Sequence, residues 1–93
     1  MFKGNMSKLL KQAQEMQQQI EDVQSQLSEL IITADSGGGM VSVKVNGKQE
    51  VLDLNIDLEA MKEEREVLED LIISALNKAL SKSQTDSQEK MNS

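Results

Sequence analysis

The chain has no cysteine, histidine, proline, tryptophan or tyrosine, and Phe2 is its only aromatic residue. Without cysteine there is no disulfide, no thiolate nucleophile and no cysteine-ligated zinc. Without histidine the commonest metal ligand and general base is missing. An active site would have to use carboxylates, lysines and hydroxyls alone, and no spacing of these residues favours one. We therefore expect a protein that is not an enzyme, with no cofactor, no metal and no small-molecule substrate.

Long apolar runs are also missing. None approaches the ~20 residues that a membrane helix needs, and the N-terminal lysines are not followed by the apolar stretch of a signal peptide. We expect a cytoplasmic protein with no membrane partner. A length of 93 residues predicts one small domain with a thin core, which favours self-association. The formal net charge of −6 argues against an overall basic coat for nucleic acid.

The first third of the chain has a heptad pattern. Two interleaved sets of apolar residues each recur every seven positions, namely Phe2, Leu9, Met16, Val23 and Leu30 with Met6, Ala13, Ile20 and Leu27. This pattern predicts a helix over about residues 5–30. Such a helix would be roughly 39 Å long, whereas a compact domain of this size has a radius of gyration of ~12 Å. The helix would overhang its own core, so it needs a partner helix or a second subunit.

After this helix the apolar period changes to two. A β-prone run at residues 31–35 is followed by Ser36-Gly37-Gly38-Gly39, and alternating residues then predict two strands, carried by Val41, Val43 and Val45 and by Leu52, Leu54 and Ile56. Asn46-Gly47 between them is typical of a two-residue type I′ hairpin turn. That turn would pair Val41 with Leu52 and place both apolar sets on one face.

The glycine-rich segment has two interpretations. It could cradle a phosphate, but no Lys-Ser/Thr follows and the next element is a predicted strand rather than a helix N-terminus. A flexible connection between strands is therefore the preferred interpretation.

The last third predicts a second helix. Asp57 is a suitable N-cap, and acidic residues follow it where the helix dipole favours them. An apolar stripe continues along Leu68, Leu71, Ile72, Ala75, Leu76, Ala79 and Leu80. The crowded carboxylates on this helix are best explained by the solvated ion pairs Lys62–Glu66 and Arg65–Glu69. The predicted fold is α+β in the order α-β-β-β-α, a single domain over residues 1–93 whose tail at about 83–93 is polar and frayed.

Charge is unevenly distributed along the first helix. Residues 1–14 contain three lysines and no acid, whereas residues 15–30 contain four acids and no base. This order opposes the helix dipole, so helix stability does not explain it. One interpretation is that the lysines pair with the acidic part of the last helix. The other is a positive tip, formed by Lys3, Lys8 and Lys11 with Lys78 and Lys82 of the same or another subunit. A dimer would duplicate these charges and strengthen phosphate binding.

Three segments together resemble the YbaB/EbfC family of nucleoid-associated proteins. They are Gly4-Asn5-Met6 with the stretch at 11–17, the segment at 36–47, and the helix at 67–72 with Ala75, Asn77 and Ala79; Gln88-Glu89-Lys90-Met91 adds to the likeness. The resemblance implies a bacterial, intertwined homodimer with a shared sheet and helices that project like tweezers. It also implies DNA binding in the nucleoid, with roles in nucleoid organisation and gene regulation.

Carried over by position, the resemblance assigns DNA contact to the helix residues Lys3, Lys8, Lys11, Lys78 and Lys82. Some family members carry basic residues in the third strand, where this chain has Leu52 and Asp53. The departure shifts the expected DNA contact away from the sheet and toward the helix ends. The alternative function is a protein-interaction module without DNA binding, similar to a prefoldin subunit that grips clients with its helix tips.

Overall fold

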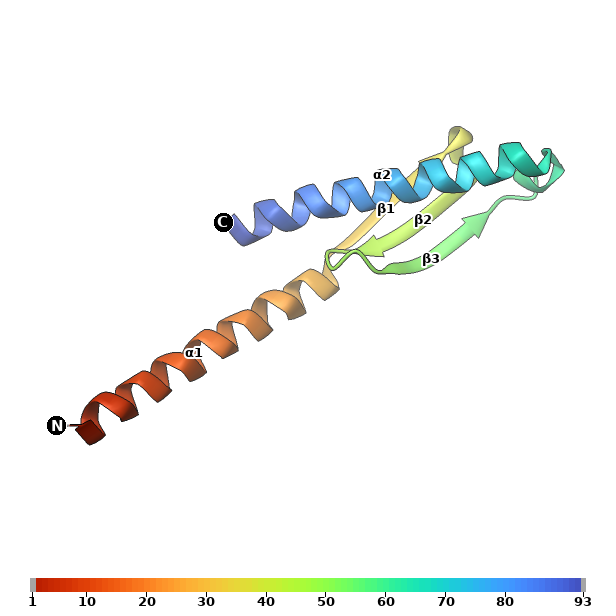
Figure 1. Cartoon of the computed structure of the whole chain (residues 1–93). Coiled ribbons are helices and arrows are strands. Elements are labelled where there is room, and N and C mark those ends of the chain that lie inside the picture. Colours follow the sequence, from red (N-terminus) through yellow and green to blue (C-terminus); the bar gives the residue numbers. More distant parts are fainter. Residues whose placement is uncertain (1, 93) are drawn as a thin grey trace.

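The computed structural model describes residues 2–92 and contains two long helices around a small sheet (Figure 1). The elements are α1 (Phe2–Glu29), β1 (Ile31–Ser36), a 3-10 turn (Gly37–Gly39), β2 (Val41–Asn46), β3 (Val51–Ile56), a second 3-10 turn (Ala60–Lys62) and α2 (Arg65–Asn92). The strands form one antiparallel sheet in the order β1-β2-β3. The predicted α+β fold with α-β-β-β-α order is confirmed.

The molecule is elongated because α1 projects away from the sheet (Figure 1). It measures 74 × 19 × 18 Å, and its radius of gyration is 20.3 Å, against ~12 Å for a compact chain of this length. All side chains from Asn5 to Asp22 are exposed. The predicted overhang of this helix is confirmed. The apolar heptad positions from Met6 to Ile20 lack a partner within one chain, so Met6 and Met16 are both 63% exposed rather than packed.

The core lies between α2 and the first two strands. Its fully buried apolar residues are Ile32, Val41, Val43 and Val45 of the sheet, Ala60 of the second 3-10 turn, and Ala75 and Ala79 of α2. Alanines on the inner face of α2 allow the helix to approach the sheet closely. Full burial of each valine contributes about 1.5–3 kcal/mol. Because α2 lies over β1 and β2, β3 stays largely uncovered (Figure 1).

The hairpin between β2 and β3 differs from the predicted one. Val41 pairs with Ile56 and Val43 with Leu54, and a bulge then places Val45 opposite Val51. The predicted two-residue turn is therefore wrong. The predicted register is also wrong, because the partner of Val41 lies four residues further along the chain than Leu52. An even shift keeps side chains on the same face, so Leu54 and Ile56 still share the face of the valines.

The Asn46 side chain explains why the loop is wider than a type I′ turn. Its Oδ1 accepts hydrogen bonds from the backbone amides of Lys48 and Glu50, both at 3.0 Å. Its Nδ2 donates to Glu50 Oε1 at 2.8 Å. The positive φ in this loop, 64°, falls on Gln49 instead of on Asn46 or Gly47. Side-chain hydrogen bonding thus replaces the short turn that the dipeptide alone would favour.

The same loop joins both helices through a set of contacts that we call the joint, made by Leu27, Asn46, Gly47, Ser83 and Ser87. The Gly47 amide donates to the Leu27 carbonyl at 2.8 Å. Ser83 Oγ donates to the Asn46 carbonyl at 2.6 Å, and Ser87 Oγ donates to the Gly47 carbonyl at 2.5 Å. A Cβ on Gly47 would lie 2.7 Å from the Leu27 carbonyl oxygen. Glycine is therefore needed here for close approach to α1 and not for a positive φ.

Both ends of α2 differ from the sequence prediction. The helix begins at Arg65 rather than directly after Asp57. The Asp57 carbonyl instead accepts a hydrogen bond from the Ala60 amide, a 3-10 turn follows at Ala60–Lys62, and Glu63 is extended, with ψ at 160°. At the other end α2 continues to Asn92, whereas fraying is predicted from about Ser83. Ser83 is fully buried. Together with Ser87 it continues the row of every fourth residue that includes Ala75 and Ala79, so this polar stretch is packed and hydrogen-bonded.

Replacing Gly47 with alanine tests the joint. Because the new Cβ overlaps the Leu27 backbone, we expect Gly47→Ala to lower the free energy of unfolding by about 1–3 kcal/mol. Urea unfolding followed by circular dichroism measures the change. The control is Lys48→Ala at the next, exposed position, which should stay within about 0.5 kcal/mol of the parent. Equal stability of the parent chain and Gly47→Ala would contradict the close approach.

Candidate nucleic-acid interface

The free end of α1 carries an exposed basic tip. Lys8 and Lys11 are three residues apart and therefore neighbours on the helix surface, and both are exposed. Within residues 2–92 neither side chain has a hydrogen bond or an ion pair. Lys3 also belongs to α1, but its side chain lies outside the described part of the chain. The positive charges at the tip are thus available to an anionic partner.

The charge on α1 changes sign along its length. Lys8, Glu15, Asp22 and Glu29 are spaced by seven residues, so they lie along one strip of the helix. The first is basic and the other three are acidic, and all four are exposed. The strip confines positive potential to the free end of the helix.

The tip is not neutralised by the acidic start of α2. The N-terminus of α1 and the start of α2 lie at opposite ends of the molecule (Figure 1). Two ion pairs at the start of α2 are local: Arg65 Nε lies 2.8 Å from Glu69, as predicted, and Lys62 Nζ lies 3.4 Å from Glu59 instead of pairing with Glu66. Within one chain, the interpretation that the N-terminal lysines pair with the last helix is therefore wrong.

Lys78 and Lys82 lie elsewhere, on the stretch of α2 that packs on the sheet and the joint. Lys78 Nζ donates to the Asp35 carbonyl at 3.3 Å, and Lys82 is exposed without a partner among the described residues. The joint places Leu27 close to Ser87 of α2. At 1.5 Å per residue, Lys11 lies about 24 Å from Leu27 along α1. One chain thus brings Lys8 and Lys11 together but leaves the two α2 lysines apart from them.

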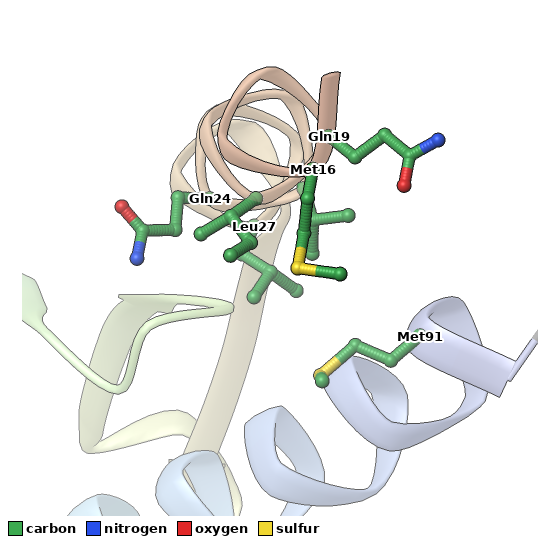
Figure 2. Close-up of a pocket in the computed structure, with 7 residues that line it drawn as sticks. Met16, Gln19, Gln24, Leu27 and Met91 are labelled. Atoms are coloured by element: carbon green, nitrogen blue, oxygen red, sulfur yellow. The ribbon is translucent and has the colours of Figure 1, made fainter. Parts of the chain in front are cut away.

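An apolar groove separates α1 from the end of α2. Its volume is about 440 Å³, and it is lined by Met16, Gln19, Ile20, Val23, Gln24, Leu27 and Met91. Figure 2 shows Met16 and Leu27 of α1 pointing toward the α2 side, where Met91 lies. The lining has no charged group, so the groove can bind only by apolar and amide contacts.

Residues 2–92 contain no cluster of three or more side chains of the kinds that ligate metals. Neither helix is long and apolar enough to cross a membrane.

Comparison with known proteins identifies the family. A family model described as the YbaB/EbfC DNA-binding family matches residues 2–93. The chain belongs to this family. A nucleoid-associated protein of Legionella pneumophila (strain Corby) is 45% identical to this YbaB/EbfC chain over 87 residues, which are 94% of the chain and 78% of the relative. A nucleoid-associated protein of Hahella chejuensis is 41% identical over 91 residues, 98% of the chain and 84% of the relative.

A solved structure supports the fold of this YbaB/EbfC chain. The crystal structure of the uncharacterized protein HP0035 from Helicobacter pylori superposes with a TM-score of 0.70 at 29% identity, covering 85% of this chain and 93% of that one. The resemblance seen in the sequence is thereby confirmed. The family is a DNA-binding family, so DNA is the partner that family membership supports.

The sequence patterns do not predict the joint. They predict a local turn at Asn46-Gly47 and a frayed tail that includes Ser83 and Ser87. One signal was available: Ala75, Ala79, Ser83 and Ser87 form an unbroken row of small residues at a spacing of four. Such a row indicates close approach of a helix to other backbone, with serine where a carbonyl must be satisfied.

The basic tip should be dispensable for folding. Because Lys8 and Lys11 are exposed and have no described partner, Lys8→Gln with Lys11→Gln should change the free energy of unfolding by less than about 0.5 kcal/mol. Urea unfolding measures it. A loss above 2 kcal/mol would mean that these lysines make folding contacts that one chain lacks.

Proposed function

We propose that the protein is a nucleoid-associated DNA-binding protein that contacts duplex DNA through the phosphates. The observation that carries this proposal is the basic tip, where Lys8 and Lys11 are exposed on a helix that stands away from an acidic body. Lys3 belongs to the same acid-free segment. The names of the relatives support a nucleoid location. The proposed role is in nucleoid organisation and gene regulation, in the cytoplasm.

The protein acts as a homodimer in this proposal. Val51 and Leu52 are each 51% exposed, and Leu54 is 43% exposed, because α2 does not cover β3. An uncovered apolar edge strand favours association with another sheet. A second copy on this surface would shield these side chains and give the assembly two basic tips. Lys78 and Lys82 then belong to the DNA-binding surface only if the partner's α1 approaches them.

Phosphate contact rather than base reading is the expected mode. Lysine ammonium groups act as point charges toward phosphate. The residue best suited to bidentate reading of guanine is arginine, and the single Arg65 is paired with Glu69. Binding should therefore depend strongly on salt and only weakly on DNA sequence.

The second candidate function is the protein-interaction module. Its supporting observation is that Met6, Leu9 and Leu10 at the same tip are 62–64% exposed. These apolar side chains could hold an unfolded client, as in prefoldin-like proteins. Suppression of the aggregation of an unfolded test protein, without any gel shift of duplex DNA, would favour this function over the first.

The DNA-binding proposal predicts a specific change in salt dependence. Lys8→Gln with Lys11→Gln should weaken binding of a mixed-sequence duplex at low salt. Each lost phosphate contact reduces the slope of log K against log salt by about 1. We expect a reduction of about 2 if one chain contacts the DNA and about 4 if two do. Fluorescence anisotropy at several salt concentrations measures the slope.

A charge-matched variant controls for net charge. Lys44→Gln with Lys48→Gln removes the same charge from exposed positions in β2 and the hairpin loop, and it should leave the slope unchanged. The assignment to the tip fails if both double variants bind alike. The proposal as a whole fails if the parent chain binds no duplex at low salt.

The homodimer proposal predicts that β3 is sensitive to charge. Leu54→Asp places a carboxylate on the uncovered apolar face and should convert the assembly to monomers, which sedimentation equilibrium would detect. Asn55→Asp adds the same charge to the opposite face of β3 and should leave the assembly intact. A monomeric parent chain, or an intact dimer of Leu54→Asp, would contradict the role of this surface.

A further inference from the structure

The Asn46-Gly47 dipeptide has a chemical reactivity that DNA binding does not use. In an asparagine-glycine sequence, the glycine backbone nitrogen can attack the asparagine side-chain carbonyl carbon Cγ. A bond forms between this nitrogen and Cγ, the bond from Cγ to the side-chain nitrogen breaks, and the proton of the glycine amide passes to the side-chain nitrogen, which leaves as ammonia. Water then opens the cyclic imide to aspartate or isoaspartate. Glycine makes this reaction fast because it has no Cβ to hinder the attack.

The structure holds both reacting groups away from this path. The Gly47 nitrogen, which would attack, donates to the Leu27 carbonyl at 2.8 Å. The Asn46 side chain, which would be attacked, is held at both ends by three hydrogen bonds to Lys48 and Glu50, of 2.8–3.0 Å. Asn46 is only 3% exposed, so water has little access to the imide. All these contacts must open before the nitrogen reaches Cγ.

The joint also controls how often this opening occurs. Ser83 donates to the carbonyl of Asn46, and Ser87 donates to the carbonyl of Gly47. These are the carbonyls of the two reacting residues, and both serines belong to α2. The backbone that must rotate for the attack is thus restrained by α1 on one side and by α2 on the other.

We propose that Asn46 is a deamidation site whose reaction is suppressed by the joint and proceeds when the joint opens. Only water is consumed and only ammonia is released. The rate of deamidation at Asn46 in the folded chain therefore depends on the fraction of time for which α1 is detached from the hairpin loop.

The products would prevent the joint from closing again. Aspartate replaces the Nδ2 donor with a carboxylate oxygen facing Glu50 Oε1, where the hydrogen bond is now 2.8 Å, and two like charges repel at that separation. Isoaspartate adds a backbone carbon before Gly47, which displaces the Gly47 amide from Leu27. Either product loosens the attachment that sets the direction of α1, so deamidation would be irreversible in its structural effect.

Mass spectrometry of the aged full-length chain tests this. The chain is incubated in mildly alkaline buffer, and the peptide containing Asn46 is followed for conversion to aspartate and isoaspartate. We expect the folded parent to react at least about tenfold more slowly than the same chain in denaturant. Ser87→Ala removes one restraint and should accelerate the folded reaction about fivefold, the typical effect of one lost hydrogen bond. Asn55 and Asn77, which precede bulkier residues, serve as internal controls and should stay intact.

A second measurement keeps the test decisive if Ser87→Ala does not fold. Hydrogen exchange of the Gly47 amide reports the same opening. In the parent chain at increasing sub-denaturing urea concentrations, exchange at Gly47 and conversion of Asn46 should increase in parallel. The proposal is overturned if Asn46 reacts equally fast in folded and denatured chains. It is also overturned if exchange at Gly47 rises while the conversion rate stays constant.

Discussion

The hydrogen bond from the Gly47 amide to the Leu27 carbonyl is the constraint on which the shape of the molecule depends. Leu27 belongs to the last turn of α1, where carbonyls have no partner within the helix, and that turn contains no basic residue. The Leu27 carbonyl accepts a hydrogen bond of 3.3 Å from the Leu30 amide, and the Gly47 amide of the hairpin loop supplies a second, shorter one of 2.8 Å. Because the side chains of α1 from Asn5 to Asp22 are exposed, its direction is set at this end. The absence of a Cβ at Gly47 allows the approach.

The contact has a consequence for how apolar surface is distributed. With α1 held at one end and pointing away, its heptad residues cannot return to the sheet, and the core is limited to the layer between α2 and two strands. A chain of 93 residues buries a smaller fraction of its surface on folding than a large domain does, so apolar side chains left outside the core weaken its stability. The apolar heptad residues of α1 and the apolar side chains of β3 therefore stay exposed in the single chain. The proposed dimer would cover part of this apolar area.

Periodicity predicted the elements, but contacts distant in sequence decided their ends and connections. The heptads of α1 are a local signal of a helix, and the alternation of Val41, Val43 and Val45 is a local signal of a strand; both elements are present. Asn46-Gly47 gave a strong local signal for a short turn that is absent, because its side chain and backbone bind partners outside the dipeptide. Ser83 is predicted to lie in a frayed tail because its partner, the Asn46 carbonyl, is also distant in sequence. The basic tip was visible as a charge pattern, yet its separation from Lys82 depends on the direction of α1, which no local pattern encodes.

Net charge alone does not decide whether such a chain can bind DNA. At 0.1 M salt, exposed charges are largely screened beyond about 10 Å. Along α1, Asp22 and Glu29 lie about 17 and 27 Å from Lys11, while Glu15 lies only about 6 Å away. A phosphate at the tip would therefore interact with the lysines and with Glu15, but hardly with the acidic residues of the body. A projecting helix thus lets a protein with a net charge of −6 present a local positive charge. The same geometry makes the direction of α1, and hence the joint, a condition for the proposed function.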